Sequence, residues 1–159
     1  MANSVGRVVI LTPLVVFGIG MVGSVAVESG MSWYRTLTLP PWTPPGQVIG
    51  FAWSMLFLLV TISIVLVWMR VPRGWAFTAI QALYAVQALC FLGWTTLFFG
   101  GHAIVAAGVV SAVYACAIIA GSVLVWPHSR EAAIVQIPHA AWVCFATALT
   151  VVVWTLNRG

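Results

Sequence analysis

The sequence predicts an all-α membrane protein, a bundle of five transmembrane helices with a first loop rich in proline and tryptophan. Two observations lead to this fold class. Of the 159 residues, 63% are hydrophobic and 5% are charged, whereas a soluble domain carries roughly 25% charged residues. In addition, five apolar segments are long enough for a helix that crosses the bilayer, which takes about 20 residues. The length suffices for one domain, residues 1–159, and no second.

The first span covers about residues 8–27 and follows Arg7. An apolar stretch behind a basic residue is also typical of a signal peptide, but this one is longer than the apolar region of most such peptides. We therefore interpret it as a retained transmembrane helix. A loop from Trp33 to Pro45 separates it from the second span, about residues 47–69.

Short breaks define the other spans. The first break is residues 70–74, and the third span follows at about 75–98. Two glycines form the second break, before the fourth span at about 102–126. Residues 126–131 form the last break, before the fifth span at about 132–156. Pro138 lies inside the fifth span, where a proline is tolerated if neighbouring helices satisfy the freed carbonyl. We expect it to kink that helix.

The arginines predict the orientation, because an odd number of spans places the termini on opposite sides of the membrane. The amino-terminal side carries Arg7, Arg70, Arg73 and Arg130, and the opposite side carries Arg35 and Arg158. By the positive-inside rule, the amino terminus is cytoplasmic and the first loop is external. The arginines form no basic stripe, so the expected partner is the lipid bilayer and not nucleic acid.

The loop between the first two spans is the most informative segment. It opens with Trp33 and Tyr34 and contains Trp42 and four prolines, including Pro44 and Pro45. Because indoles settle at the membrane–water interface, an aromatic belt explains any single tryptophan. Prolines restrict the backbone, however, and the grouping favours a preformed lid over a cavity. The lid residues are then Trp33, Trp42, Pro44 and Pro45.

Motifs for several other functions are absent or fail in context. Residues 18–23 match the G-x-G-x-x-G dinucleotide fingerprint, but they lie inside a span with no strand before them. We interpret these glycines as a thin face of the first helix. The three cysteines are isolated, so neither a zinc site nor a disulfide framework is indicated. With Glu28 and Glu131 as the sole acids, we assign no catalytic residue and no metal site.

Two polar side chains lie deep inside spans. His139 precedes Trp142 by three residues in the fifth span, and an ionisable group at membrane depth is costly enough to suggest a function. One interpretation is a neutral histidine that is hydrogen-bonded within the bundle. The other is a polar contact, or an axial haem ligand, for a molecule in a cavity. Gln87 in the third span is open to a polar role of the same kind.

Small residues recur at every fourth position of the fourth span, at Ala103, Ala107, Ser111 and Ala115. Small residues at this spacing let helix backbones approach closely. We expect them to serve packing within the bundle, with contact between two copies in a homodimer as the second use.

These features together resemble the tryptophan-rich sensory proteins, also called translocator proteins (the TspO/MBR family), in a bacterial-type form. The resemblance runs over nearly the whole chain and implies residence in the bacterial cytoplasmic membrane. It rests on Trp33-Tyr34, Pro41-Trp42-Thr43-Pro44-Pro45-Gly46, Trp53, Tyr84-Ala85-Val86-Gln87, Trp94-Thr95, Phe98-Phe99-Gly100, Pro138, Trp142 and Ala146-Thr147.

The chain departs from the family pattern at several positions. Phe91 stands where the family usually has asparagine, His139 where it usually has tyrosine, and Thr150 where it usually has asparagine or serine. The cholesterol motif of animal members needs a carboxy-terminal tyrosine followed by a basic residue. Since no tyrosine follows Tyr114, cholesterol is not supported as a partner.

The resemblance implies a porphyrin- or haem-type tetrapyrrole as the ligand, with no obligatory cofactor, in a cavity under the first loop. A cavity of indole and phenyl faces suits such a flat molecule. Arg35 is placed to meet a propionate. By matching positions, the ligand-binding residues are Ser24, Tyr34, Ile49, Trp53, Phe57, Gln87, Phe91, Trp94, His139, Trp142 and Ala146.

Three functions stay open at this point. The first is a tetrapyrrole-binding sensor or carrier. The second is an enzyme that degrades bound porphyrin under light and oxygen, in which Trp53 and Trp142 would be the oxidisable residues. The third is a membrane bundle with only a structural or partner role.

Overall fold

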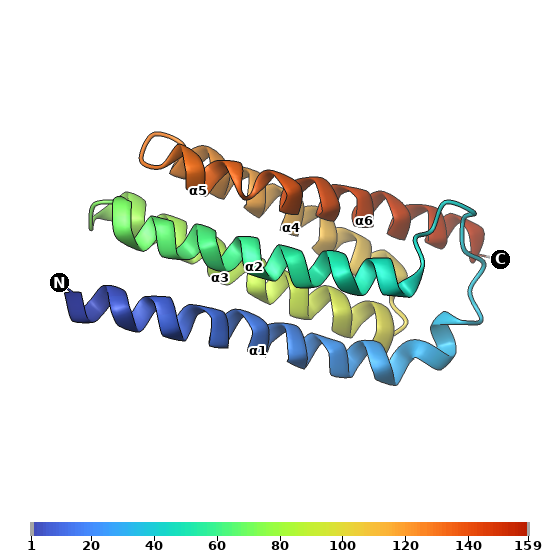
Figure 1. The fold of residues 1–159 in the computed structure, drawn as a ribbon. Helices are drawn as coiled ribbons and strands as arrows, with labels where there is room; N and C mark the ends of the chain where they lie inside the picture. The colour runs from blue at the N-terminus through green and yellow to red at the C-terminus, as the bar shows by residue number, and fades with distance from the viewer. Residues whose placement is uncertain (1, 159) are drawn as a thin grey trace.

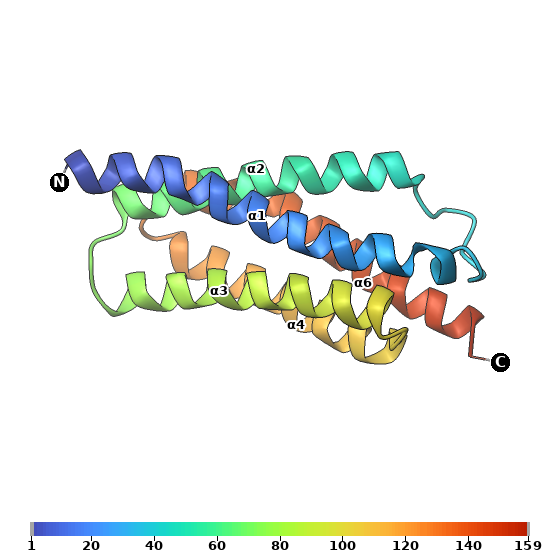
Figure 2. The same ribbon diagram turned by 90° about the horizontal axis from the view of Figure 1, so that it is seen from below.

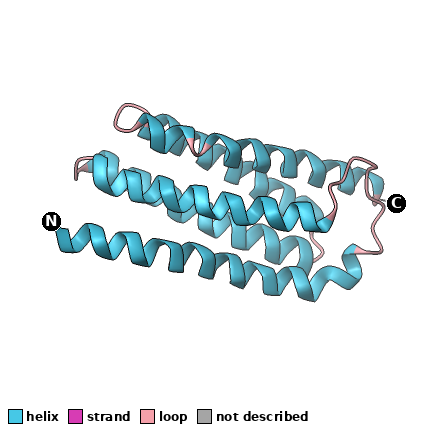
Figure 3. Cartoon of the chain, in the orientation of Figure 1, coloured by secondary structure: helices cyan, strands magenta, loops and turns pink. Residues whose placement is uncertain are grey.

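A computed structural model describes residues 2–158, which contain helices and no strand (Figures 1 and 3). The predicted all-α fold class is confirmed. Five helical segments are long and apolar enough to cross a membrane. The helices are α1 (Ala2–Tyr34), α2 (Gly46–Arg70), α3 (Trp75–Thr95), the π-helix η1 (Thr96–Gly100), α4 (Ile104–Val125), α5 (Arg130–Ile134) and α6 (Ile137–Leu156).

Helix α1 is longer than predicted and contains Trp33 and Tyr34 as its last residues. The expectation that these two aromatic residues open the first loop is therefore wrong. The loop consists of residues 35–45. It lies at the same end of the bundle as the carboxy terminus, whereas the amino terminus lies at the opposite end (Figure 1).

The fifth span is two helices and not one kinked helix. Helix α5 ends at Ile134, and α6 starts at Ile137 with Pro138 in its first turn. Proline lacks an N–H for the carbonyl four residues earlier, and its ring clashes with that carbonyl. The chain therefore tightens before the proline, where the Gln136 N–H donates to the Ala133 carbonyl at 3.1 Å. The predicted local kink is in fact a short helix break.

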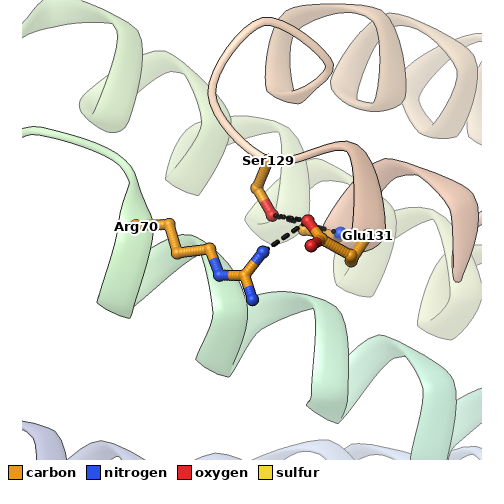
Figure 4. A network of polar contacts seen from close by, with 4 residues as sticks. Arg70, Ser129 and Glu131 are labelled. Atoms are coloured by element: carbon orange, nitrogen blue, oxygen red, sulfur yellow. Dashed lines mark hydrogen bonds and ion pairs between the residues drawn. The ribbon is translucent and has the colours of Figure 1, made fainter.

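Helix α5, which precedes the break, is anchored to α2. The Arg70 guanidinium pairs with the Glu131 carboxylate, and the Ser129 hydroxyl donates to the same carboxylate at 3.4 Å (Figure 4). The Ser129 oxygen also accepts from the Ala132 N–H at 3.3 Å, which caps α5. About two turns before Arg70 on α2, the buried Ser63 hydroxyl donates to the Ala132 carbonyl at 2.6 Å. Polar contacts thus fix α5 against α2.

The long helices form a ring around an interior space. Helix α1 packs on α2, α3 and η1, helix α4 packs on α3 and α6, and α2 packs on α5 and α6. Figure 2 shows α1 crossing α2 near the amino-terminal end and moving away from it toward the loop end. Helices α2 and α3 are instead bridged by large side chains. Trp53 and Phe57 of α2, for example, both reach Phe91 of α3, with ring centroids 5.1 and 5.3 Å apart.

Small residues let neighbouring helices of the bundle pack closely. Ala107, Ser111 and Ala115 are buried in the bundle, as expected for packing between helices of one copy. On α1, an added Cβ at Gly20 would lie 2.5 Å from the Phe57 ring, and one at Gly23 would lie 2.5 Å from the Phe91 ring. The thin face predicted for α1 therefore exists.

The thin face differs from the prediction at its two ends. Gly18 has no atom within 4 Å of an added Cβ and does not belong to it. Gly30, which the sequence pattern did not single out, does: an added Cβ there would lie 2.6 Å from the Phe99 carbonyl carbon of η1.

Candidate ligand-binding cavity

A cavity of about 800 Å³ lies inside the ring, beneath the first loop. Residues of α1, the loop, α2, α3, η1 and α6 line it, and α4 contributes none. Proteins bind small organic molecules in cavities of roughly 300–1,000 Å³. The volume is therefore sufficient for a ligand of substantial size.

Most of the ligand-binding residues that the resemblance implied line this cavity. Their binding role stays a prediction, but the structure brings them together from four elements. They are Ser24 and Tyr34 on α1, Ile49, Trp53 and Phe57 on α2, Phe91 and Trp94 on α3, and Trp142 and Ala146 on α6.

The floor of the cavity is an aromatic cluster. The rings of Trp53, Phe57 and Phe91 touch one another, with centroids between 5.1 and 5.9 Å apart. Gly20 and Gly23 leave the room that two of these rings occupy. Phe91 stands where the resemblance leads one to expect asparagine, so the floor is apolar and offers no amide at this point.

A second aromatic group forms the wall toward the loop. Trp94 stacks on Phe98 at 5.6 Å, and Tyr34 lies 5.6 Å from Phe99. The Trp94 indole N–H is buried and has no hydrogen-bond partner within the described residues. A ligand would therefore meet the ring of Trp94 but could not reach its N–H without a movement of the wall.

On the side of α1 and α2 the cavity is open. The lining residues Met21 and Phe17 are 70% and 40% exposed, whereas Phe91 in the floor is buried. Met21 lies in the middle of a transmembrane helix. This opening therefore faces the hydrocarbon region of the bilayer.

Only part of the predicted lid touches the cavity. Pro44 and Pro45 line it together with Thr43. Trp33 and Trp42 do not: Trp33 stacks on His102 at 4.2 Å, and Trp42 packs edge-on against Phe145 at 5.7 Å. Both indoles are packed outside the cavity, so their expected position over it is wrong.

The loop is also tied to the carboxy-terminal end of α6 by Asn157, a residue that the sequence pattern did not indicate. The Asn157 side chain accepts from the Thr38 N–H at 2.9 Å and donates to the Thr38 carbonyl at 2.9 Å. The same amide donates to the Val153 carbonyl at 2.8 Å. Both backbone groups of Thr38 are thereby hydrogen-bonded to one side chain, which attaches the loop to the end of α6.

We expect Asn157→Ala to loosen this loop. The substitution leaves the Thr38 backbone groups without their partners, and each lost hydrogen bond contributes about 1 kcal/mol. A ligand held under the loop should then dissociate several-fold faster, which stopped-flow fluorescence would detect. Asn157→Asp keeps the acceptor for the Thr38 N–H and should have a smaller effect. Equal dissociation rates in all three proteins would contradict a role of the loop in retention.

His139 and Gln87 do not line the cavity, contrary to the expectation for both. His139 is 2% exposed, and both of its ring nitrogens have partners. Nδ1 donates to the Gln136 side-chain oxygen at 3.1 Å, so Nε2 accepts from the Tyr114 hydroxyl at 2.8 Å. Gln87 is 4% exposed and donates to the Ala117 carbonyl of α4 at 3.5 Å. Of the two interpretations of His139, the structure supports the histidine bonded within the bundle.

The orientation of His139 follows from the helix break. The break at residues 135–136 starts α6 afresh, so that His139 faces Tyr114 of α4 while Trp142 faces the cavity. Because neither imidazole nitrogen is free, the hypothesis of an axial haem ligand is wrong for this conformation.

We expect His139→Phe to lower stability and to leave any haem spectrum unchanged. The substitution strands the Tyr114 hydroxyl and the Gln136 amide in the interior, at about 1–3 kcal/mol for each unsatisfied group. The thermal-unfolding midpoint in detergent and the absorption spectrum of a ferric haem complex provide the two measurements. The exposed His128, changed to phenylalanine, is the control for both. Loss of a histidine-ligated spectrum in His139→Phe alone would restore the ligand hypothesis.

Comparison with known proteins identifies the family. A family model described as the TspO/MBR family matches residues 9–155. The tryptophan-rich protein TspO of Archaeoglobus fulgidus is 33% identical over 147 residues, which cover 91% of this chain and 93% of the relative. Protein CrtK of Rhodobacter capsulatus is 32% identical over 134 residues, 84% of each chain. The translocator protein of Homo sapiens is 33% identical over 132 residues, 82% of this chain and 78% of the relative. The protein with the aromatic cavity beneath its first loop is therefore a multi-pass membrane protein that belongs to the TspO/MBR family.

Proposed function

We propose that this protein binds porphyrin- or haem-type tetrapyrroles in the cavity beneath the first loop, as a sensor or carrier. The observation that carries the proposal is the aromatic lining of an 800 Å³ cavity on several sides. Trp53 and Phe91 form its floor, Trp94 and Tyr34 a wall, and Trp142 the side of α6.

Such a lining suits a flat aromatic molecule for two physical reasons. Stacked and edge-on aromatic contacts contribute about 0.5–1.5 kcal/mol each beyond the burial of their area. Rings already packed against one another also lose little side-chain entropy when a ligand arrives. Trp53, for example, is already fixed between Phe57 and Phe91.

The proposal is tested by titrating the purified protein with protoporphyrin in the dark. We expect saturable quenching of tryptophan fluorescence with one porphyrin bound per chain, together with a shift of the porphyrin absorbance. Detergent micelles without protein provide the control for partition of the porphyrin into detergent. A linear signal, with no saturation above that control, would leave the protein with a structural or partner role.

A second candidate function, light-dependent degradation of porphyrin, rests on the placement of Trp53 and Trp142. Both line the same cavity, so a porphyrin bound there would contact two oxidisable indoles. Illumination of the complex in air, followed by mass spectrometry, separates the two functions. If the protein degrades its ligand, a modified porphyrin forms faster than in micelles alone, and the Trp53→Phe, Trp142→Phe double variant loses this difference. If it only binds, the rates with and without protein are equal.

A further inference from the structure

The polar side chains that line the cavity are not equally available to a ligand. Most of them are hydroxyls whose hydrogens are already donated to backbone carbonyls three or four residues earlier in the chain. Ser24 donates to Met21 at 2.8 Å, Ser54 to Gly50 at 3.0 Å, and Thr150 to Ala146 at 2.8 Å. Thr95 and Thr43 are used in the same way. These hydroxyls are therefore poor anchors for an anionic group.

Two lining residues differ from these hydroxyls: Tyr34, whose hydroxyl has no hydrogen-bond partner within residues 2–158 but is neutral, and Arg35. Arg35 is the charged one of the two. It is the one lining residue that carries a formal charge, and it follows the last residue of α1 at the loop end of the cavity. Its backbone N–H donates to the Met31 carbonyl at 3.2 Å, which continues the helical path and fixes where the side chain starts. Within residues 2–158 no carboxylate pairs with its guanidinium and no aromatic ring lies beneath it.

The opposite end of the cavity has no charge at all. The floor consists of the rings of Trp53, Phe57 and Phe91. A cavity with an apolar floor and a single cation at its loop end is complementary to an amphipathic molecule, with its apolar edge inside and an anionic edge at the loop.

We propose that Arg35 selects ligands that carry a carboxylate on one edge and orients that edge toward the first loop. The inference rests on the proposed tetrapyrrole-binding function and adds the orientation and the charge of the ligand. A guanidinium matches a carboxylate through two parallel N–H···O hydrogen bonds. Arg35 is exposed at the loop end of the cavity, so the pair is screened by salt and contributes a modest amount to affinity.

Arg158 provides a matched control. It lies at the same end of the molecule, beyond α6, and its guanidinium is placed over the Trp154 ring, 5.2 Å from the centroid. It does not line the cavity. If Arg35 contributes only to the net charge of this side of the membrane, Arg35→Gln should change ligand binding as Arg158→Gln does.

The experiment compares protoporphyrin, which has two carboxylates, with its dimethyl ester, which has none and keeps the same ring. Dissociation constants are measured in the dark for the unchanged protein, Arg35→Gln and Arg158→Gln. We expect the unchanged protein and Arg158→Gln to bind the diacid about fivefold more tightly than the ester, the effect of one charged hydrogen-bonded pair at a partly exposed site. In Arg35→Gln the two dissociation constants should become equal, through weaker binding of the diacid.

Three results would overturn the inference. A preference for the diacid that survives in Arg35→Gln, or a protein that binds both molecules equally, removes Arg35 as the selecting residue while leaving porphyrin binding intact. An equal loss of preference in Arg158→Gln assigns the effect to the general charge of the membrane side. Failure of the unchanged protein to bind either molecule overturns the proposed function together with this inference.

Discussion

Replacing Trp53 or Trp142 with phenylalanine is expected to weaken porphyrin binding about fivefold for each substitution, since an aromatic contact contributes about 1 kcal/mol. Both indoles line the cavity, one from α2 and one from α6. Trp53 packs on Phe57 and Phe91, and Trp142 packs on Phe145 at 5.5 Å. Phenylalanine keeps an aromatic ring at each position but loses the larger face of the indole.

The matched substitutions are Trp68→Phe and Trp154→Phe. Trp68 packs on Phe77 and Arg73 near the other end of the bundle, and Trp154 packs against Arg158. Neither lines the cavity. Both fit the interfacial belt that tryptophans form in membranes. Dissociation constants that rise equally in all four variants would show that the titration reports general damage and would contradict the cavity assignment.

Gly30→Ala is expected to lower the stability of the protein by about 2–3 kcal/mol, the upper part of the range for an overpacked site. The added methyl group would lie 2.6 Å from the Phe99 carbonyl carbon and in still closer contact with the carbonyl oxygen. These are backbone atoms of η1, which cannot rotate away as a side chain can. Helix α1 must then separate from η1, and the wall that contains Tyr34 and Phe99 must move with it.

Thermal unfolding in detergent measures this effect, and Gly18→Ala is the control on the same helix. No atom lies within 4 Å of an added Cβ at Gly18, and alanine favours a helix over glycine by about 1 kcal/mol. Gly18→Ala should therefore unfold at an equal or higher temperature than the unchanged protein. If Gly30→Ala behaves in the same way, α1 and η1 do not pack as the structure has them.

The transmembrane fold could be predicted from sequence because its cause is visible in composition. A bilayer requires apolar segments of a certain length and satisfied backbone groups, and both appear as uninterrupted runs between short polar breaks. The ends of the helices were harder to predict. Trp33 and Tyr34 were expected in the loop, since amphipathic aromatic residues are compatible with a helix end and with a loop alike.

The positions of cavity residues were predictable where the family resemblance supplied them, as for Trp53 and Trp94. Those of His139 and Gln87 were not, because the direction in which a helix faces inside a bundle depends on contacts with its neighbours. The partners of His139 are Gln136, one turn away, and Tyr114 on another helix. A single sequence does not show that Pro138 would break the helix and turn His139 toward Tyr114 of α4.

Asn157 was missed for a related reason. An asparagine just after the last apolar span looks like an ordinary helix end, where this residue type is common. Its partner, Thr38, is distant in the sequence and contributes backbone atoms only. No side-chain pattern marks such a contact, so it emerges only when the loop and the end of α6 are seen together.

The most direct test of the account is a structure of the protein with bound zinc protoporphyrin, whose metal marks the position of the ring in anomalous scattering. We expect the porphyrin inside the cavity, with the ring against Trp53 and Phe91 and the carboxylates toward Arg35 and the first loop. His139 should still be bonded to Tyr114. A porphyrin located on the outer, lipid-facing surface of the helices, with the cavity unoccupied, would contradict it.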